Sequence, residues 1–525
     1  MIKTKYITLL LGLASLSLGS CSDFLSTLPD DRKEVNTTQA VQQLLVSAYP
    51  QGGFYSVLAE MSSDNVQEAY DYRDRTSRFY DQLFAWQDPV DIDSDAPVVI
   101  WSYNYKAINT ANVALDQLAQ LPETAQNRAL RGEALLCRAW GHFVLSNVFS
   151  VGYDPQTATT QLGVPYVTVP EKSIDASYSR ESVADNFTHI ANDLEEGIKL
   201  LDDGIYTTGK KFHFTRQAAY AFAARFYLYY QQWDKAIEYA NLTLGSSPYP
   251  ALRNYDAILA LPSTSYQNRA LAFTEYNERN NIFFLAGTTQ GGYVFGPYSV
   301  RGARYNHRSA LATSETTGAR AAWWSDDQND SKLKLEPSAM VSDKTVVTRY
   351  PALMIPVSPG SASGYNTSVI PEFTTDETLL VRAEAYINKG QYDLALADMN
   401  AWLANATTEY QTLNESRIAS WNEATLYATA KSPSPRKRME PTFTLRDTKH
   451  EQFLQVLLHM RRIETLHTGL RWFDIKRYGI ALQRSTVLSG SVIRELEYTL
   501  SARDKRHAIQ LPAEVIAAGL PANPR

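Results

Sequence analysis

The chain is poor in cysteine: its 525 residues include only two, Cys21 and Cys137. Two cysteines cannot form the disulfide framework that stabilises small secreted domains, so packing must hold this fold together. A chain of this length with 44% hydrophobic residues can bury a large core. Cys137 stands between Leu136 and Arg138 in a helical pattern, which predicts a buried small hydrophobic residue there.

An excess of positive charge is also missing, since 50 Lys and Arg stand against 56 Asp and Glu. This balance argues against nucleic acid as a partner, because binding to phosphates needs a basic face. After residue 20, no apolar run approaches the roughly 18 residues that a transmembrane helix needs. These two absences exclude nucleic-acid binding and membrane spanning as expected functions.

Catalytic and metal-binding motifs are missing too. The sequence has no G-x-S-x-G, Walker or dinucleotide-binding motif. His459, Glu464 and His467 lie close together in sequence, but their spacing differs from H-E-x-x-H, so no metal site is predicted. The acidic run 326–330 could favour Ca²⁺ through its oxygens, yet the twelve-residue EF-hand spacing is absent. We therefore predict no catalytic residues, no metal and no cofactor.

The N-terminus carries the most informative pattern that is present. Lys3 and Lys5 precede an apolar stretch at residues 7–18, which is too short to span a bilayer. Leu18-Gly19-Ser20-Cys21 then places a thiol directly after small residues, which is typical of a lipoprotein signal. We predict a signal peptide at residues 1–20 and lipidation of Cys21. Loss of the two lysines changes the formal charge from −6 to −8.

Two or three acyl chains on Cys21 would hold the protein stably at a membrane, whereas one chain holds it only marginally. We expect a tethered protein whose body, residues 21–525, is a single soluble unit. If Cys21 carries lipid, Cys137 has no disulfide partner.

Helical periodicity dominates this body. Apolar residues recur at helical spacing in segments 127–149, 215–244, 377–402 and 453–479. In the second and third of these, Trp233-Asp234-Lys235-Ala236 and Tyr392-Asp393-Leu394-Ala395 occupy the same place, after an Ala-rich helix. An aromatic and a small residue at such positions are typical of tetratricopeptide helix pairs.

The two copies are 159 residues apart (392 minus 233), so a continuous solenoid is not expected. We predict a mainly α fold with minor short strands, built on helix pairs near residues 100–149, 215–244, 377–403 and 450–479. Long insertions rich in Gly, Pro, Ser and Asn would interrupt the pairs at 151–180, 245–375 and 404–450.

The segment 453–479 reads FLQVLLHMRRIETLHTGLRWFDIKRYG. Its apolar residues, up to His467, are predicted to share one helix face, and Gly469 is predicted to end or bend that helix. The block resembles the C-terminal signature of the SusD/RagB family. Cys21-Ser22-Asp23-Phe24-Leu25 is similar to the family's lipidated N-terminus, and residues 131–147 resemble its first long scaffold helix. The helix predicted before residues 131–147 carries Trp101, Tyr105, Ile108 and Asn112 on one face. Trp101 is assigned to the core.

The resemblance implies a glycan-binding lipoprotein on the surface of the outer membrane. Members of this family act as a lid on a SusC-like TonB-dependent transporter, to which they deliver captured oligosaccharide without breaking bonds. The implied partners are an oligosaccharide, the transporter and the membrane through the lipid anchor. Three alternatives stay open: a peptide-binding, RagB-like member of the family, a surface glycoside hydrolase, and a pure scaffold protein whose repeats lack a sugar-sized cleft.

Two loop segments, near 61–90 and 285–330, combine flat rings with planar hydrogen-bonding groups. A sugar ring presents an apolar C–H face and a rim of hydroxyls, so its site needs both kinds of group. Any single ring among them could instead fill the core. The candidate glycan-binding residues are Asp64, Asn65, Tyr72, Arg73 and Trp86 in the first segment, and Tyr293, Tyr298, Arg301 and Trp324 in the second.

Overall fold

The computed structural model describes residues 36–74, 77–171, 177–245, 251–297, 303–324, 333–334, 339–341, 344–361, 363–488 and 491–525. The predicted signal peptide, Cys21, Tyr298, Arg301 and the acidic run 326–330 lie outside these residues. The fold is mainly α, as predicted. No helix in the described parts of the chain is long and apolar enough to cross a membrane.

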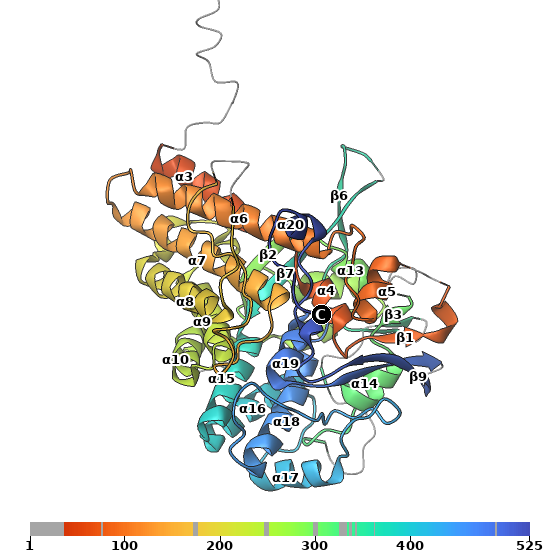
Figure 1. Cartoon of the computed structure of the whole chain (residues 1–525). Helices are drawn as coiled ribbons and strands as arrows, with labels where there is room; N and C mark the ends of the chain where they lie inside the picture. Colours follow the sequence, from red (N-terminus) through yellow and green to blue (C-terminus); the bar gives the residue numbers. More distant parts are fainter. Residues whose placement is uncertain are drawn as a thin grey trace, which may run out of the picture.

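A layer of antiparallel helices forms one half of the molecule (Figure 1). Neighbours in this helical array pack against one another in the order α6, α7, α8, α9, α10, α15, α16. Trp101 and Cys137 are buried in it, as expected. The bounds are α3 Thr38–Leu45, α6 Pro97–Leu118, α7 Ala125–Phe149, α8 Val183–Leu200, α9 Arg216–Tyr229, α10 Trp233–Leu244, α15 Thr375–Lys389 and α16 Tyr392–Ala406.

The two tetratricopeptide-like hairpins are present, and each second helix begins at the predicted aromatic residue. Trp233 opens α10 and Tyr392 opens α16. However, α10 packs directly against α15, so the hairpins are neighbours in space although 159 residues separate them in sequence. The long insertion therefore separates the pairs in sequence, as predicted, but not in space: it leaves after α10 and returns at α15 without breaking the stack.

The insertion at 245–375 is far more regular than the predicted loops. Strand β2 (Asn281–Thr288) pairs antiparallel with the long strand β7 (Gly364–Thr374), and β6 (Leu353–Pro356) pairs with the outer part of β7. Phe283 and Phe373 from this sheet are fully buried against the helical array. The insertion also contains α11 Tyr255–Leu259, α12 Tyr266–Phe273, α13 Gly291–Val294, α14 Ser309–Glu315, β4 Ala339–Val341 and β5 Lys344–Val346.

A second sheet, of order β3-β1-β8-β9, gathers segments from the whole length of the chain. Strand β1 runs parallel to β8 and antiparallel to β3, while β8 and β9 form a hairpin. Its strands are β1 Gln67–Ala69, β3 Tyr305–Asn306, β8 Leu482–Leu488 and β9 Ser491–Leu500. Further elements are α4 Ser56–Ser62, η2 Tyr70–Tyr72, α5 Arg78–Phe84, α17 Glu415–Ala424 and α20 Ala513–Ala517.

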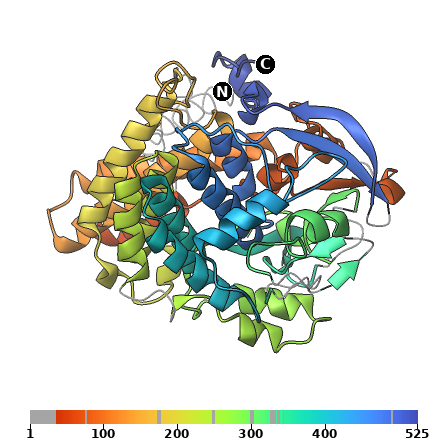
Figure 2. The ribbon, with the colours of Figure 1, turned by 90° about the horizontal axis from the view of Figure 1, so that it is seen from below.

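Helices α18 (Thr448–Glu464) and α19 (Leu470–Tyr478) lie between the helical array and the strand-containing half (Figures 1 and 2). Helix α18 ends at Glu464, five residues before Gly469, so His467 does not lie on the helix face where the sequence predicted it. Gly469 opens α19 with a φ of +82°, where a side chain is strained, and a Cβ there would lie 2.9 Å from the Cα of Ser56.

Four buried charges join α18 and α19 to the helical array; we call them the array-side cluster. Asp474 lies 3.2 Å from Arg461 and 2.6 Å from Arg477. Glu384 of α15 accepts a 2.6 Å hydrogen bond from Arg477 and lies 3.3 Å from Arg461. Burial alone raises the pKa of Asp474, but the two guanidinium groups outweigh it, so its pKa lies below the ordinary value.

Five further charges, the sheet-side cluster, join the same two helices to the other half. Arg471 donates two hydrogen bonds to Asp64, of 2.8 and 2.9 Å. Arg462 contacts both Asp64 and Glu315 of α14, and Lys437 lies 2.6 Å from Glu315. Every one of these side chains is buried or nearly so. The charged residues of the 453–479 signature are therefore structural: one set holds each half of the molecule.

We predict that Asp474→Ala destabilises the protein by about 3–5 kcal/mol, because it leaves two buried guanidinium groups with one carboxylate. Urea unfolding at neutral pH measures this. Because the folded-state pKa of Asp474 is depressed, its contribution is present above the unfolded pKa and is lost as pH falls. The difference between wild type and variant should therefore shrink below about pH 4.

The matched control is Glu196→Ala, which removes a half-exposed partner 3.0 Å from Arg131. An exposed ion pair contributes less than about 1 kcal/mol. Equal effects of the two substitutions would show that the array-side cluster has no special structural role.

Candidate functional site

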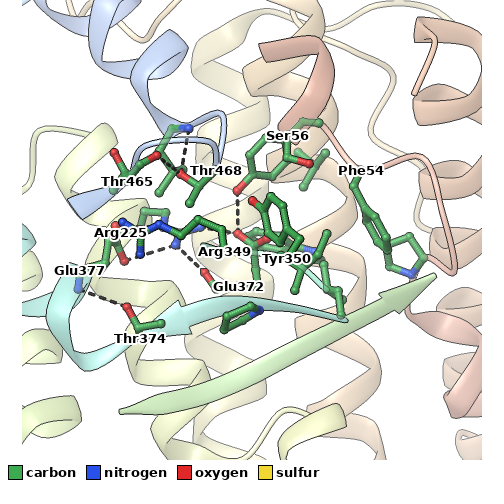
Figure 3. A pocket seen from close by; sticks show the side chains of 18 of the residues that line it. Phe54, Ser56, Arg225, Arg349, Tyr350, Glu372, Thr374, Glu377, Thr465 and Thr468 are labelled. Atoms are coloured by element: carbon green, nitrogen blue, oxygen red, sulfur yellow. Dashed lines mark hydrogen bonds and ion pairs between the residues drawn. The ribbon is translucent and has the colours of Figure 1, made fainter. Parts of the chain in front are cut away.

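A small cavity in the core is lined by charged groups but is too small for a sugar. Its volume is about 50 Å³, room for on the order of three waters (Figure 3). Arg225 of α9 lies 2.6 Å from Glu372 and 3.2 Å from Glu377, and Tyr55 donates a 2.7 Å hydrogen bond to Glu372. Arg225 and Tyr55 thus already occupy these carboxylates, so the cavity is part of the scaffold.

The pairing of β1 with β3 brings the two predicted binding segments together. Gln67 pairs with Asn306 and Glu68 with Tyr305, so residues 61–90 and 285–330 meet at this ladder. Arg304 reinforces the junction, with guanidinium nitrogens 2.8 Å from Glu68 and 3.1 Å from Asp81. Tyr305 stacks on Phe84 at 4.5 Å between ring centroids.

The short helix η2 places exposed rings beside this junction. Tyr70 is 48% exposed, and the guanidinium of Arg73 lies 5.6 Å from its ring centroid. Tyr72 is half-buried, and Arg73 is exposed. The Arg73 guanidinium is exposed and also lies 4.0 Å from Glu68. An open ring beside such a group offers both the apolar face and the hydrogen-bond donors that a sugar needs.

A groove opens on the same sheet, between the β8–β9 hairpin, α14 and the loop 428–438; we call it the β8–β9 groove. Its volume is about 490 Å³, within the range of pockets that hold small ligands. Its lining mixes aliphatic groups with amides, hydroxyls and charges. Lining residues with polar side chains include Asp64, Gln67, Glu315, Thr429, Lys437, Arg438, Gln483, Ser485, Glu495 and Thr499.

The floor of the β8–β9 groove is fixed by the sheet-side cluster. Asp64 and Glu315 both face Lys437, at 3.8 and 2.6 Å. Burial alone raises the pKa of Asp64, but Arg462, Arg471 and Lys437 outweigh it and hold the pKa well below its ordinary value. Asp64 is therefore a permanent anion that is already paired.

The outer wall of the groove is more open to a ligand. Two guanidinium groups lie over the ring of Tyr427, next to the lining residue Ala428, with Arg436 at 3.9 Å and Arg438 at 4.7 Å from its centroid. Arg438 is exposed, as are Gln483 and Thr499 on the opposite wall. Their donors and acceptors point to a groove that can form hydrogen bonds with hydroxyls from two sides.

Three of the predicted residues are engaged in the structure itself. Asn65 is fully buried, where it donates to Glu60 at 3.0 Å and accepts from Arg462 at 2.8 Å. Trp86 is only 5% exposed, and its indole N–H donates to the carbonyl of Ser62 at 2.8 Å. The expected exposure of Asn65 and Trp86 is thus corrected, and Asp64 is available only as part of the groove floor.

The other predicted residues have varied positions. Tyr293 on α13 is half-buried, and so is Trp324, whose indole N–H donates to the carbonyl of Ala319 at 3.1 Å. Trp323, its neighbour, is fully buried. The outer wall of the groove was not predicted from the sequence. The signal that could have identified it is the basic run Arg436-Lys437-Arg438, close after Tyr427.

The histidines considered for a metal site are buried, and His467 lies 3.5 Å from a single carboxylate, that of Glu60. Burial lowers the pKa of His459 to about 3, so its ring is neutral. Burial raises the pKa of Glu464 to about 7, and the indole of Trp402 donates to it at 2.8 Å. Among the described residues no group of three His, Cys, Asp or Glu could hold a metal ion.

Comparison with models of known families shows to which family the chain belongs. A family model described as "SusD family" matches residues 224–509, more than half of the chain. The chain belongs to the SusD family. A second model, described as "Starch-binding associating with outer membrane", matches residues 23–228. The family resemblance drawn from the 453–479 signature is thereby confirmed.

Solved structures share the SusD fold over nearly the whole chain. A SusD superfamily protein from Bacteroides thetaiotaomicron has a TM-score of 0.62 and 18% identity, over 93% of this chain and 100% of its own. A SusD-like carbohydrate binding protein from Bacteroides vulgatus has a TM-score of 0.55 and 14% identity, over 92% and 96%.

A laminarin binding SusD-like protein has a TM-score of 0.52 and 16% identity, over 93% of this chain and 99% of its own. At these identities the likeness is one of fold. No curated protein matches the chain.

We predict that Trp86→Ala lowers the free energy of unfolding by about 3–5 kcal/mol, because it empties a core site and removes a buried hydrogen bond. Thermal and urea unfolding measure this change. The exposed ring of Tyr70 is the matched control, and Tyr70→Ala should cost less than about 0.5 kcal/mol. Unchanged stability in the Trp86 variant would return that ring to the list of surface groups.

Proposed function

We propose that this SusD family protein captures glycans at the cell surface and delivers them intact to a SusC-like TonB-dependent transporter. The observation that carries the proposal is the β8–β9 groove, with exposed hydrogen-bonding side chains on two walls, near the exposed ring of Tyr70 on η2. A groove of about 490 Å³ suits a short stretch of a sugar chain.

The proteins that share the fold support this proposal. One solved relative is described as carbohydrate binding and another as laminarin binding. The model that matches residues 23–228 is described as starch-binding and associating with the outer membrane. With the predicted signal peptide at residues 1–20 and the predicted lipidation of Cys21, these descriptions favour an anchored protein at the outer membrane.

The electrostatics of the groove favour binding over cleavage. Glycosidases use two carboxyl groups about 5–10 Å apart, one of which must carry a proton at working pH. Asp64 stays ionised because its pKa is held well below the ordinary value, and Glu315 is paired with Lys437. Neither carboxylate of the groove floor is placed to act as a general acid.

We predict that Gln483→Ala combined with Arg438→Ala weakens glycan affinity about tenfold or more. One hydrogen bond to a charged group contributes roughly 1.5–3 kcal/mol, and 1.4 kcal/mol is a factor of ten. Isothermal titration calorimetry with starch and laminarin oligosaccharides measures the affinity, and chromatography of the mixtures detects cleavage. The matched control is Gln120→Ala with Arg128→Ala, exposed residues of α6–α7 in the helical array.

Binding without products supports the proposal. Released shorter sugars would identify a hydrolase, and affinity for peptides with none for glycans would identify a peptide-binding member. Equal loss in the groove variant and the control would move the site away from the β8–β9 groove.

We also predict that Cys21→Ala releases the protein from membranes, because no described helix can replace the acyl anchor. Fractionation of cells into membrane and soluble material measures this. The matched control, Cys137→Ala, changes the other cysteine, which is buried in α7. Retention of the Cys21 variant in the membrane pellet would show that another element provides the anchor.

A further inference from the structure

The β6–β7 hairpin projects from the body as a narrow arm (Figure 1). We call its described residues, 353–361 and 363–367, the arm. Its strands pair from Leu353 with Thr367 to Pro356 with Gly364, and the N–H of Val357 donates to the carbonyl of Ser363 at 3.0 Å. The ladder is therefore regular almost to its tip.

One face of the arm is apolar and open. Ile355 pairs directly with Tyr365, and Val357 follows two residues later, so the three side chains share a face. They are 58%, 62% and 59% exposed, in the order Ile355, Tyr365, Val357. The sequence from Tyr350 to Pro371 contains no Asp, Glu, Lys, Arg or His.

Such a surface is unusual for a strand at a sheet edge. In the order β2-β7-β6, strand β6 is the edge, and edge strands are ordinarily protected by charges or by a cover. Exposed apolar clusters of this kind mark interaction sites. The arm lacks protecting charges on both strands, so its chemistry fits a face that a partner covers.

The base of the arm is firmly held, so the arm is a fixed projection. The Asn366 amide donates to Gln290 at 2.7 Å, and the Ser368 hydroxyl donates to the carbonyl of Pro351 at 2.9 Å. The Tyr350 hydroxyl donates to the carbonyl of His467 at 3.0 Å, which connects the base to the turn between α18 and α19. A preformed arm can dock without an ordering cost.

The arm lies on the same side of the molecule as the start of the described chain, and this indicates where its partner lies. Figure 1 shows the arm on the side of the molecule where α3 begins the described chain. Asn36 follows Cys21 by only 15 positions (36 minus 21), and a chain of that length spans at most about 54 Å. If Cys21 is lipidated, as proposed above, this side is tethered close to the membrane.

The chemistry of the arm favours a protein over lipid. Segments that bind membrane surfaces combine a large apolar face with Lys and Arg, and the arm has only a small apolar face and no Lys or Arg. A compact group of one Tyr and two β-branched residues, beside an open strand edge, suits a recess on a folded partner. We propose that the arm docks in an uncharged, apolar recess on the outer surface of the barrel transporter that receives the ligand.

Crosslinking in the intact cell envelope tests this docking. A photo-reactive residue replaces Ile355 in the full-length chain, and in a matched control it replaces Leu426, which is 78% exposed just after α17, at the opposite end in Figure 1. We expect a product with an outer-membrane barrel protein, identified by mass spectrometry, from position 355 only. Crosslinks to lipid, to a second copy of the chain, or equally from both positions would overturn the proposal.

Substitution gives an independent measurement. Ile355→Ser, Val357→Ser and Tyr365→Ser together should reduce the barrel protein that co-purifies with the tagged chain at least tenfold, while melting temperature and glycan affinity stay unchanged. Leu426→Ser is the control. Undiminished co-purification would overturn the proposal.

A vesicle experiment separates the arm from a lipid contact. The Cys21→Ala protein is mixed with vesicles of phosphatidylethanolamine and phosphatidylglycerol, and we expect no flotation; flotation that requires the arm would assign it to lipid and overturn the docking. This inference rests on the proposed function, but the two fail separately. A chain that binds no glycan yet crosslinks to a barrel would refute glycan capture alone.

Discussion

The fold depends on placing nine charged side chains in its interior at once. Removing an ion from water costs several kcal/mol, and only a close partner of opposite charge offsets that cost. The array-side and sheet-side clusters meet this condition at α18 and α19, where Asp474 pairs with Arg461 and Arg477, and Asp64 with Arg462 and Arg471. We interpret these clusters as specifying how the two halves fit, since a shifted half would leave buried charges unpaired.

The need to pair these buried charges also fixes part of the β8–β9 groove. The sheet-side cluster fixes Asp64, and Asp64 together with Gln67 forms part of the groove lining. Lys437, on the loop that forms the outer wall, is held by Glu315 and by a 3.1 Å hydrogen bond from its backbone N–H to Gln455 of α18. The groove is therefore preformed at its floor, while residues such as Arg438 and Gln483 at the rim are free to determine what binds.

The local sequence pattern predicted the helical half of the fold but little of the half that contains the strands. Trp233 and Tyr392 could be recognised because a 3.6-residue period and a small neighbour are visible within one segment. Strand β1 has three residues and pairs with β8 more than 400 residues later, with Glu68 opposite Thr486, and no short-range signal encodes that register. The array's continuity across 159 residues was hidden for the same reason.

The candidate site was partly predictable because composition shows which side chains suit a sugar but not which of them are already used. Trp86 and Asn65 have the right chemistry, yet each forms buried hydrogen bonds within the protein. The rim residues Gln483 and Thr499 looked like ordinary strand residues, since the groove exists only when β8 and β9 fold beside the loop 428–438.

The groove and the arm are different parts of the same rigid unit. The turn between α18 and α19 is held by Glu60, which accepts hydrogen bonds from the backbone N–H groups of His467 and Gly469. The carbonyl of His467 holds Tyr350 at the base of the arm, and Arg462, a turn earlier, holds Asp64 at the groove floor. Figure 1 shows the arm and the β8–β9 hairpin on different sides of the body. Because both are attached to one buried element, the docking proposed for the arm leaves the groove open to ligand, so the proposed capture and the proposed attachment can occur together.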